Sequence, residues 1–413
     1  MRAYRPRLVD ALLAEILDEH PAVLLTGPRA CGKTTSAMRL ARQVVRLDTD
    51  AQAAAFRADP DAALRAVATY PVLIDEWQEA PEVIGAVKRA VDIDPTPGRF
   101  ILSGSVRAPL LNESWPGTGR LIDLPMTTFS AREYLGETGG LAWLERLVSA
   151  GTDIGLPVEM PDLLGYIEIA LAGGFPEPIT SLGERGRVRW YAGYVKQLLD
   201  RDVGSLTLDV DAPRLNSYLR SYALNSAGVT EHATIFSAAG INRKTADRYE
   251  GLLEALFLVE RLPAWTTNRL KRLVMQPKRL LVDTGLWGSL VGVHARDVMA
   301  DGNLIGRLLE TFVVAQLRAE LPLMPFTRLH HLRTEGGRQE VDIVAEIGAE
   351  RVVGIEVTAT ASPGPNDGKH LAWLRDQLHE KFSLGVVLHT GPQAYQLGER
   401  IIALPICALW GPN

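Results

Sequence analysis

A glycine-rich loop near the N-terminus constrains the fold more than any other feature of the chain. It reads Gly27-Pro28-Arg29-Ala30-Cys31-Gly32-Lys33-Thr34, with Thr35 after it, and it lies between the apolar run 22–26 and an amphipathic stretch. A G-x-x-x-x-G-K-T pattern between a strand and a helix is typical of a phosphate-binding P-loop, whereas a plain glycine turn before a helix needs no such spacing. We therefore expect a parallel α/β domain that binds a nucleoside triphosphate.

The residue types in this loop suit that chemistry. Glycines let backbone N–H groups turn inward around phosphate oxygens, and the following helix N-terminus adds positive potential. Lys33 would reach the β- and γ-phosphates, and the Thr34 hydroxyl would bind Mg²⁺. ATP and Mg²⁺ are thus the expected cofactors, held by residues 27–35. For Cys31 two interpretations stay open: a thiol activated by the helix N-terminus, or merely a small side chain.

A second apolar run, Val72-Leu73-Ile74, ends in two acids. Asp75 would hold magnesium and Glu76 would orient an attacking water, unless the pair only caps the strand in solvent. Further on, Arg120 in "GTGRLIDLP" is a candidate for stabilising transition-state charge in cis or in trans; the alternative is an ordinary surface arginine.

Length, cysteine content and charge narrow the class of protein. A chain of 413 residues predicts two or three domains. Its two cysteines are far apart, which argues against a disulfide framework and for a reducing compartment. Acids interrupt the first apolar run, and no apolar stretch approaches the ~20 residues of a spanning helix, so we expect a cytoplasmic protein without a membrane partner. The net charge of −5 excludes a uniformly basic nucleic-acid binder but not a basic face.

The order of motifs along nearly the whole chain resembles a group of prokaryotic AAA-superfamily P-loop ATP-binding proteins with a C-terminal domain of unknown function of the 4143 class. The motifs are "GPRACGKTT", "LIDEWQ", "ILSGS", "DLPMTTFSAREY", "GGFPEPI", "YVKQLLDRDV", "TADRYEGLLEALFLVERLPAW", "PKRLLVDTGL", "GRLLETFVVAQL" and "ALW". The resemblance implies that Ser103 senses the γ-phosphate, although a serine often simply ends a strand. It also implies that the pair Arg201-Asp202 approaches the nucleotide, unless it is a helix-end ion pair.

After an ATPase core (1–135) and a helical lid or connector (136–210), residues 211–295 predict a winged helix-turn-helix. Two helices precede a third, "GINRKTADRYEGLLEALF", and two strands follow. The third helix would present Arg243, Lys244 and Arg248 to DNA phosphates. The connection between the strands would add Arg269, Lys271, Arg272, Lys278 and Arg279. The alternative is that this segment serves as a lid or partner surface with solvated arginines.

Residues 296–413 resemble the PD-(D/E)XK nuclease-like, or restriction-endonuclease-like, α/β core. The resemblance implies a metal site built from Glu310 on a helix, Asp342 on a strand and Glu356 on the next strand, but Thr358 stands where active members have a lysine. Losing that cation would cost roughly 3 kcal/mol of transition-state stabilisation unless Lys369 or His370 replaces it. A working nuclease, an inert metal site and a structural or partner-binding module all stay open.

The sequence thus predicts an α/β protein with an AAA-like P-loop domain, a winged-helix middle and a degenerate nuclease-like end. The expected function is an Mg-ATP-binding ATPase that acts as a nucleotide-dependent switch, with DNA as the preferred partner and a protein partner or homo-oligomer left open. The alternatives are a non-catalytic ATP-binding protein that docks a partner through its C-terminal domain, and an Mg-dependent DNA nuclease.

Overall fold

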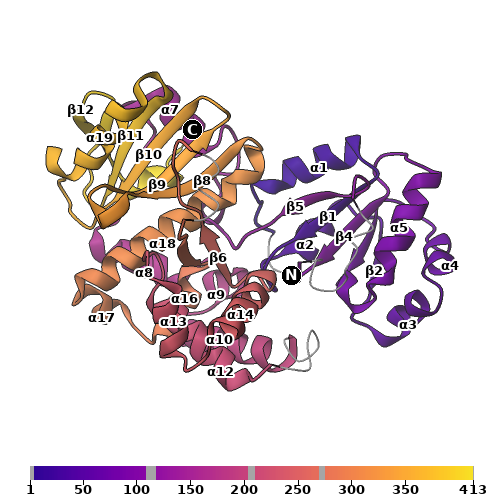
Figure 1. Ribbon diagram of the computed structural model, residues 1–413. Coiled ribbons are helices and arrows are strands. Elements are labelled where there is room, and N and C mark those ends of the chain that lie inside the picture. The colour runs from indigo at the N-terminus through magenta and orange to yellow at the C-terminus, as the bar shows by residue number, and fades with distance from the viewer. Residues whose placement is uncertain (1–3, 108–117, 203–209, 269–274, 413) are drawn as a thin grey trace. The chain divides into compact units, whose positions relative to one another are not determined.

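The computed structural model describes residues 4–107, 118–202, 210–268 and 275–412 (Figure 1). The chain divides into two compact units. The first comprises Met1–Thr128 with Gly251–Leu258, and the second comprises Phe129–Glu250 with Val259–Asn413.

The first unit contains a five-stranded sheet in the order β2-β3-β4-β1-β5, in which every neighbouring pair is parallel. Its strands are β1 (Ala22–Thr26), β2 (Gln43–Arg46), β3 (Val72–Asp75), β4 (Phe100–Gly104) and β5 (Ile122–Pro125). Its helices include α1 (Val9–Glu19), α2 (Lys33–Ala37), α3 (Asp50–Ala58), α4 (Pro60–Arg65) and α5 (Glu82–Ile93). The expected parallel α/β domain is therefore confirmed.

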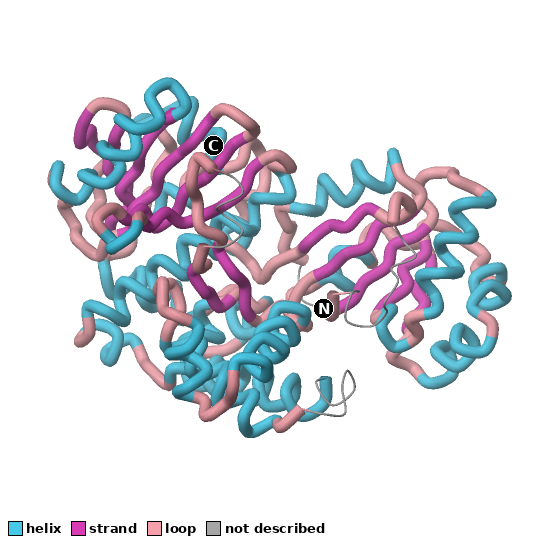
Figure 2. Tube along the Cα trace, in the orientation of Figure 1, coloured by secondary structure: helices cyan, strands magenta, loops and turns pink. Residues whose placement is uncertain are grey.

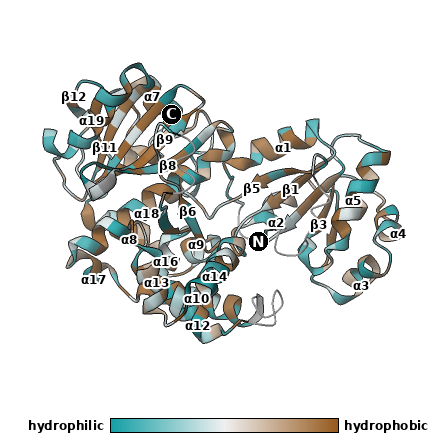
Figure 3. Ribbon diagram, in the orientation of Figure 1, coloured by the Kyte–Doolittle hydropathy of each residue, from teal (hydrophilic) through white to brown (hydrophobic). Residues whose placement is uncertain are grey.

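Side chains of this sheet alternate between two buried clusters, as the strand period of two requires. In β1, Ala22 and Leu24 pack with apolar residues of α3, α4 and α5. Val23 and Leu25 point the other way and pack with residues of α1 and α2. Both faces of the sheet are thus covered by helices, and its strands are largely brown in Figure 3.

The second unit begins with a helical region. It contains α6 (Ala131–Leu135), α7 (Trp143–Ala150), α8 (Leu163–Ala172), α9 (Pro176–Ser181) and α10 (Glu184–Gln197), followed by the π-helical turn Leu198–Asp202. Next come α12 (Ala212–Leu224), α13 (His232–Ala238) and α14 (Arg243–Ala255), then the antiparallel hairpin of β6 (Val259–Leu262) and β7 (Lys278–Leu281). Three helices followed by two strands agree with the expected order of these elements, and the winged helix-turn-helix itself stays a prediction.

Three helices connect this hairpin to the C-terminal sheet: α16 (Thr284–Val291), α17 (Ala295–Met299) and α18 (Gly302–Glu320). The six-stranded sheet has the order β12-β13-β11-β10-β9-β8. Its strands are β8 (Thr327–Arg333), β9 (Glu340–Ile347), β10 (Arg351–Val357), β11 (Phe382–His389), β12 (Tyr395–Gly398) and β13 (Ile401–Pro405). The sheet is mixed, because β8, β9 and β10 pair antiparallel whereas β11 runs parallel to β10 and β13. Figure 2 draws these strands in magenta.

One face of the C-terminal sheet is covered by α19 (Lys369–Leu378). Leu371, Leu374 and Leu378 recur at intervals of three and four, which places them on one stripe of the helix. They pack with strand residues of the sheet, among them Val341 and Val387.

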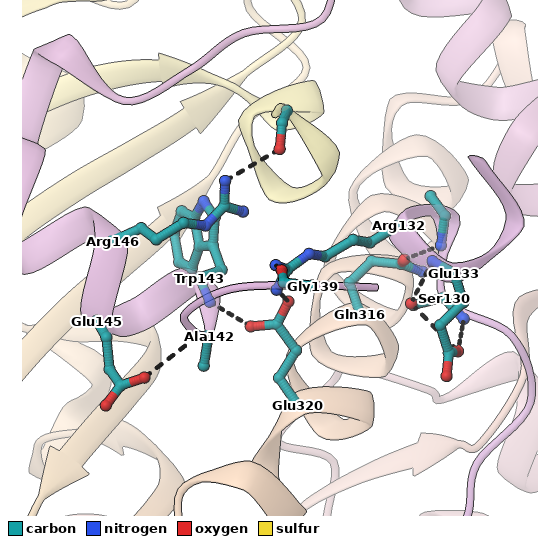
Figure 4. Close-up of polar contacts among 12 residues, drawn as sticks. Ser130, Arg132, Glu133, Gly139, Ala142, Trp143, Glu145, Arg146, Gln316 and Glu320 are labelled. Carbon is teal, nitrogen blue, oxygen red and sulfur yellow. Dashed lines mark hydrogen bonds and ion pairs between the residues drawn. The ribbon is translucent and has the colours of Figure 1, made fainter. Parts of the chain in front are cut away.

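Buried polar contacts fasten the start of the second unit to α18 (Figure 4). The Arg132 guanidinium lies 2.9 Å from Glu320 Oε1, and both side chains are almost fully buried. The second carboxylate oxygen of Glu320 accepts a hydrogen bond from the backbone N–H of Trp143. The Ala131 N–H donates to Gln316 Oε1 at 2.6 Å. These contacts join residues that are far apart in the sequence.

Candidate nucleotide-binding site

The loop after β1 has a backbone that only small residues tolerate. Gly27 has φ 154°, Ala30 has φ 62° and Gly32 has φ 107°. A Cβ atom on Gly27 would lie 2.0 Å from the carbonyl oxygen of Met126, closer than atoms can approach. Left-handed residues among right-handed ones turn successive N–H groups toward one side, which makes a concavity for an anion. The loop therefore has the local geometry of a phosphate cradle.

Lys33 begins α2 and is buried beside this loop. Its ammonium donates hydrogen bonds to the carbonyl oxygens of Gly27 at 3.0 Å and Pro28 at 2.8 Å. The Cys31 side chain is fully buried, and its thiol lies 3.6 Å from the Met126 carbonyl oxygen. This placement favours the interpretation of Cys31 as a small packing residue.

Asp75 is the last residue of β3, and its carboxylate is contacted by side chains from α2 and β4. The Thr34 hydroxyl on α2 donates to Asp75 Oδ1 at 2.8 Å. The Ser103 hydroxyl on β4 donates to the same oxygen, and the parallel register pairs Asp75 with Ser103 directly. Hydroxyl and carboxylate oxygens are the ligands that Mg²⁺ prefers, so Thr34 and Asp75 fit the ion that the sequence predicts.

Glu76 follows Asp75 in a left-handed conformation, with φ 55°. Its carboxylate accepts a hydrogen bond from the Gln78 side-chain amide and lies 3.4 Å from the Ser105 hydroxyl. Sequence reasoning singled out neither partner, although both lie inside the motifs "LIDEWQ" and "ILSGS". Their positions hold the Glu76 carboxylate at the end of the sheet where the glycine-rich loop begins.

Two side-chain contacts from outside the expected motif lie next to the loop. The Arg7 guanidinium, ahead of α1, donates to the carbonyl oxygens of Cys31 and Thr127, each at 2.8 Å. The Thr26 hydroxyl donates to Asp123 Oδ1 on β5 at 2.8 Å, and burial raises the pKa of the Asp123 carboxyl. No sequence pattern pointed to Arg7, because a single arginine in an amphipathic N-terminal segment resembles any solvated cation.

Arg120 requires a correction. It precedes β5, so it lies at the amino ends of the parallel strands, whereas the glycine-rich loop follows the carboxyl end of β1. It is 43% exposed and forms an ion pair with Asp92 near the end of α5. Arg120 therefore does not serve the loop of its own chain, and only a role in trans stays open as a proposal.

The basic residues expected to contact DNA divide into two groups. Arg243, Lys244 and Arg248 are exposed on α14. Lys278 and Arg279 on β7 are buried instead, and Arg279 Nε donates to Glu250 Oε1 at 2.7 Å. The expectation that Lys278 and Arg279 contact DNA phosphates is therefore wrong, because both side chains are buried. Arg269, Lys271 and Arg272 lie outside the described residues, as do the side chains of Arg201 and Asp202.

The acids of the nuclease-like segment come together around a lysine that the sequence did not associate with them. Lys278 Nζ lies 2.7 Å from Glu310 Oε1 and 3.2 Å from Asp342 Oδ1. Burial alone would lower the pKa of Lys278, but these two acids raise it. Burial, reinforced by Asp342, raises the pKa of Glu356. Over the described residues, no three His, Cys, Asp or Glu side chains form a group that could hold a metal ion.

The cation expected from the start of α19 is not supplied there. Lys369 is exposed, and His370 Nδ1 lies 2.6 Å from the side-chain oxygen of Gln339. Thr358, in the position of the missing lysine, bonds to the Thr360 hydroxyl at 3.2 Å. Lys278 is the residue that sequence reasoning missed, because it lies 32 positions before Glu310 and 64 before Asp342.

Family comparisons cover three parts of the chain. A model described as an AAA domain matches residues 19–135, a domain of unknown function (DUF8612) matches 164–297, and a domain of unknown function (DUF4143) matches 305–409. Two uncharacterised proteins, of Mycobacterium tuberculosis and Mycobacterium bovis, are each 27% identical over 398 residues. These alignments span 96% of this chain and 82% of each relative.

Solved structures show only distant similarity. The Walker-type ATPase PABY2304 of Pyrococcus abyssi is 14% identical with a TM-score of 0.41, covering 68% of this chain and 94% of that one. AMPPCP-bound DnaA from Aquifex aeolicus is 13% identical with a TM-score of 0.22, covering 62% and 89%.

In the part of the chain that the structure describes, no helix is both long and apolar enough to cross a membrane. The matched domains confirm the architecture that the motif order predicts. A model of an AAA domain matches the N-terminal part of the chain, and a model of a DUF4143 domain matches its C-terminal part.

Proposed function

We propose that this protein binds Mg-ATP at residues 27–35 and hydrolyses it as a nucleotide-dependent switch. The observation that carries the proposal is the meeting of the Thr34 and Ser103 hydroxyls on Asp75, beside a loop with the backbone of a phosphate cradle. Loop N–H groups and Lys33 would bind the phosphates, and Thr34 with Asp75 would hold Mg²⁺. When bound, the ion neutralises phosphate charge.

Glu76 is the proposed residue that orients the attacking water. Its carboxylate is held by Gln78 and Ser105, so its position at the strand end is defined before a ligand arrives. Ser103, already bonded to Asp75, is the proposed sensor on β4.

Binding at this site requires a local rearrangement. To reach a phosphate, the Lys33 ammonium has to leave the Gly27 and Pro28 carbonyl oxygens that it now contacts. Phosphate charge would thus draw Lys33 from one set of partners to another, and nucleotide-dependent switches commonly work through such a local change between two arrangements. The first passage of the chain into the second unit comes after Thr128, three residues beyond the end of β5.

Phosphate release in Mg²⁺ buffer tests hydrolysis. We expect Glu76→Gln to lower turnover by about 100-fold or more while ATP binding is kept, since removing a group that positions or deprotonates water has effects of that order. Glu79→Gln, which changes an exposed acid three positions on, is the matched control and should leave turnover unchanged. Equal turnover in the Glu76 variant would remove that residue from catalysis. No turnover in the unmodified protein would favour the non-catalytic ATP-binding interaction protein.

We further propose that the protein binds duplex DNA through exposed basic residues of α14. Lys244 and Arg248 are four residues apart and so lie on one face of the helix, with Arg243 beside them. We expect Lys244→Ala with Arg248→Ala to weaken duplex DNA binding and reduce the salt dependence by about two counterions. Arg214→Ala, which removes an exposed arginine of α12, is the control. Absence of salt-dependent DNA binding by the unmodified protein would exclude this partner.

A further inference from the structure

Lys278 lies in an unusual place for a lysine. Its side chain is only 1% exposed, and its ammonium lies 2.7 Å from Glu310, 3.2 Å from Asp342 and 3.8 Å from Glu340. These acids come from α18 and β9, whereas the lysine comes from β7 of the hairpin. One cation thus joins elements that are distant in the sequence.

The negative charges of Glu310 and Asp342 need a cation nearby to balance them. Glu310 and Asp342 are mostly buried, and buried like charges are unfavourable unless a counterion balances them. Glu340 is more exposed and lies 3.9 Å from Arg333 as well, so it forms the rim of the cluster. A divalent ion or an ammonium could supply the balance, and Lys278 is at hydrogen-bond distance from both inner acids.

Three of the carboxylate oxygens that a metal ion could use are already hydrogen-bonded. Glu310 Oε1 and Asp342 Oδ1 accept hydrogen bonds from Lys278. The other oxygen of Asp342 accepts one from the Val357 N–H at 3.0 Å. A phosphodiester also has no direct route to an ammonium that is 1% exposed.

Backbone contacts hold the chain around the hairpin in register with the C-terminal sheet. The His331 N–H on β8 donates to the Pro263 carbonyl oxygen at 2.9 Å, and the Trp265 N–H donates to the His331 carbonyl oxygen at 2.6 Å. His331 Nε2 lies 3.0 Å from the Gln276 carbonyl oxygen, two residues before Lys278. The segments on both sides of the hairpin connection are therefore fixed to β8.

We infer that Lys278 is the built-in cation of this carboxylate site and takes the place of a divalent metal ion between Glu310 and Asp342. The C-terminal sheet then serves as an ion-paired docking face for the β6–β7 hairpin, and it is not a metal-dependent nuclease. The inference is independent of nucleotide binding at the P-loop, because no residue of residues 27–35 takes part in it.

Calorimetric titration with Mn²⁺ tests the inference in the full-length chain. All variants carry Asp75→Asn, which removes the proposed metal ligand of the P-loop. With Lys278 intact we expect no Mn²⁺ uptake at this site, and Lys278→Ala should bind one equivalent with a dissociation constant below about 1 mM. Adding Asp342→Asn should abolish that uptake. Lys369→Ala, an exposed lysine at the start of α19, is the matched control and should behave like the parent.

Two results would overturn the inference: Mn²⁺ uptake with Lys278 intact that Asp342→Asn abolishes, or a folded Lys278→Ala protein that takes up none. If Lys278→Ala does not fold, thermal unfolding of Lys278→Met and of Lys278→Met with Glu310→Gln decides instead. We expect the double variant to melt at a higher temperature than the single one, because it removes an acid left without its cation. A double variant no more stable than the single one would equally overturn it.

Discussion

The Thr34 hydroxyl donates a 2.8 Å hydrogen bond to Asp75 Oδ1, although 41 positions separate the two residues. Thr34 follows the glycine-rich loop, which begins at the end of β1. Asp75 ends β3, and β4 lies between β1 and β3 in the sheet. Ser103, at the end of that intervening strand, bonds to the same oxygen. The proposed magnesium ligands are thus in contact before an ion binds, and the rearrangement that phosphate binding requires concerns Lys33.

Gly27→Ala should damage both stability and ATP binding. The added Cβ would lie 2.0 Å from a backbone oxygen, and φ 154° is strained for any other residue, so we expect a loss of more than about 1 kcal/mol in unfolding free energy. Gly193→Ala in α10, where nothing lies within 4 Å of the added atom, should be neutral or slightly stabilising. Chemical denaturation and ATP titration measure both effects. Unchanged stability and binding in the Gly27 variant would contradict the described loop.

Arg132→Met should strongly destabilise the second unit. It leaves Glu320 buried without its ion-pair partner, a change that costs about 3–5 kcal/mol in comparable sites. Adding Glu320→Gln should recover part of that loss in a double-mutant cycle. Arg89→Ala, which breaks an exposed pair with Asp61, is the control and should have little effect. A small loss for Arg132→Met in denaturant unfolding would show that the pair is not buried.

The buried His331 should make the free energy of unfolding fall in acid. Burial, reinforced by Lys278, lowers the pKa of this imidazole to about 4 from an ordinary value of 6.5, so the folded protein favours the neutral ring. Stability is fully present above pH 6.5 and falls as the pH drops toward 4, by up to about 1.4 kcal/mol per unit.

Unfolding measured between pH 4 and 7 should therefore show a shallower slope for His331→Gln than for the unmodified protein. His294→Gln, at a histidine whose side chain is 61% exposed, should keep the original slope. The same slope in all three proteins would mean that His331 is not buried in a neutral form.

The nucleotide site could be predicted from the sequence because its signals are contiguous. Residues 27–34 specify the loop by themselves, and Asp75 and Glu76 directly follow an apolar strand. Parallel strands have their carboxyl ends at one edge of a sheet, so the glycine-rich loop after β1 and the acids at the end of β3 lie close together. The partners of Glu76 were missed because Gln78 and Ser105 are common polar residues whose role depends on the turn geometry.

Other assignments depended on tertiary pairing that local pattern cannot supply. Lys278 sits in a basic segment that suggests phosphate contact, yet its neighbours in space are acids from α18 and β9. Arg120 follows a loop rich in glycine, and only the direction of β5 shows that it lies at the wrong edge of the sheet. Elements with a regular apolar period, such as α18 and β9, were predictable from the sequence.

Nucleotide binding by the glycine-rich loop can be measured by calorimetric titration of the full-length protein with ATP in Mg²⁺ buffer. We expect uptake of one equivalent of ATP, and Lys33→Ala should weaken binding by at least tenfold because the loop loses its only buried ammonium among the described residues 27–35. Absence of ATP uptake by the unmodified protein, or equal affinity in the Lys33 variant, would show that the loop does not bind ATP as proposed.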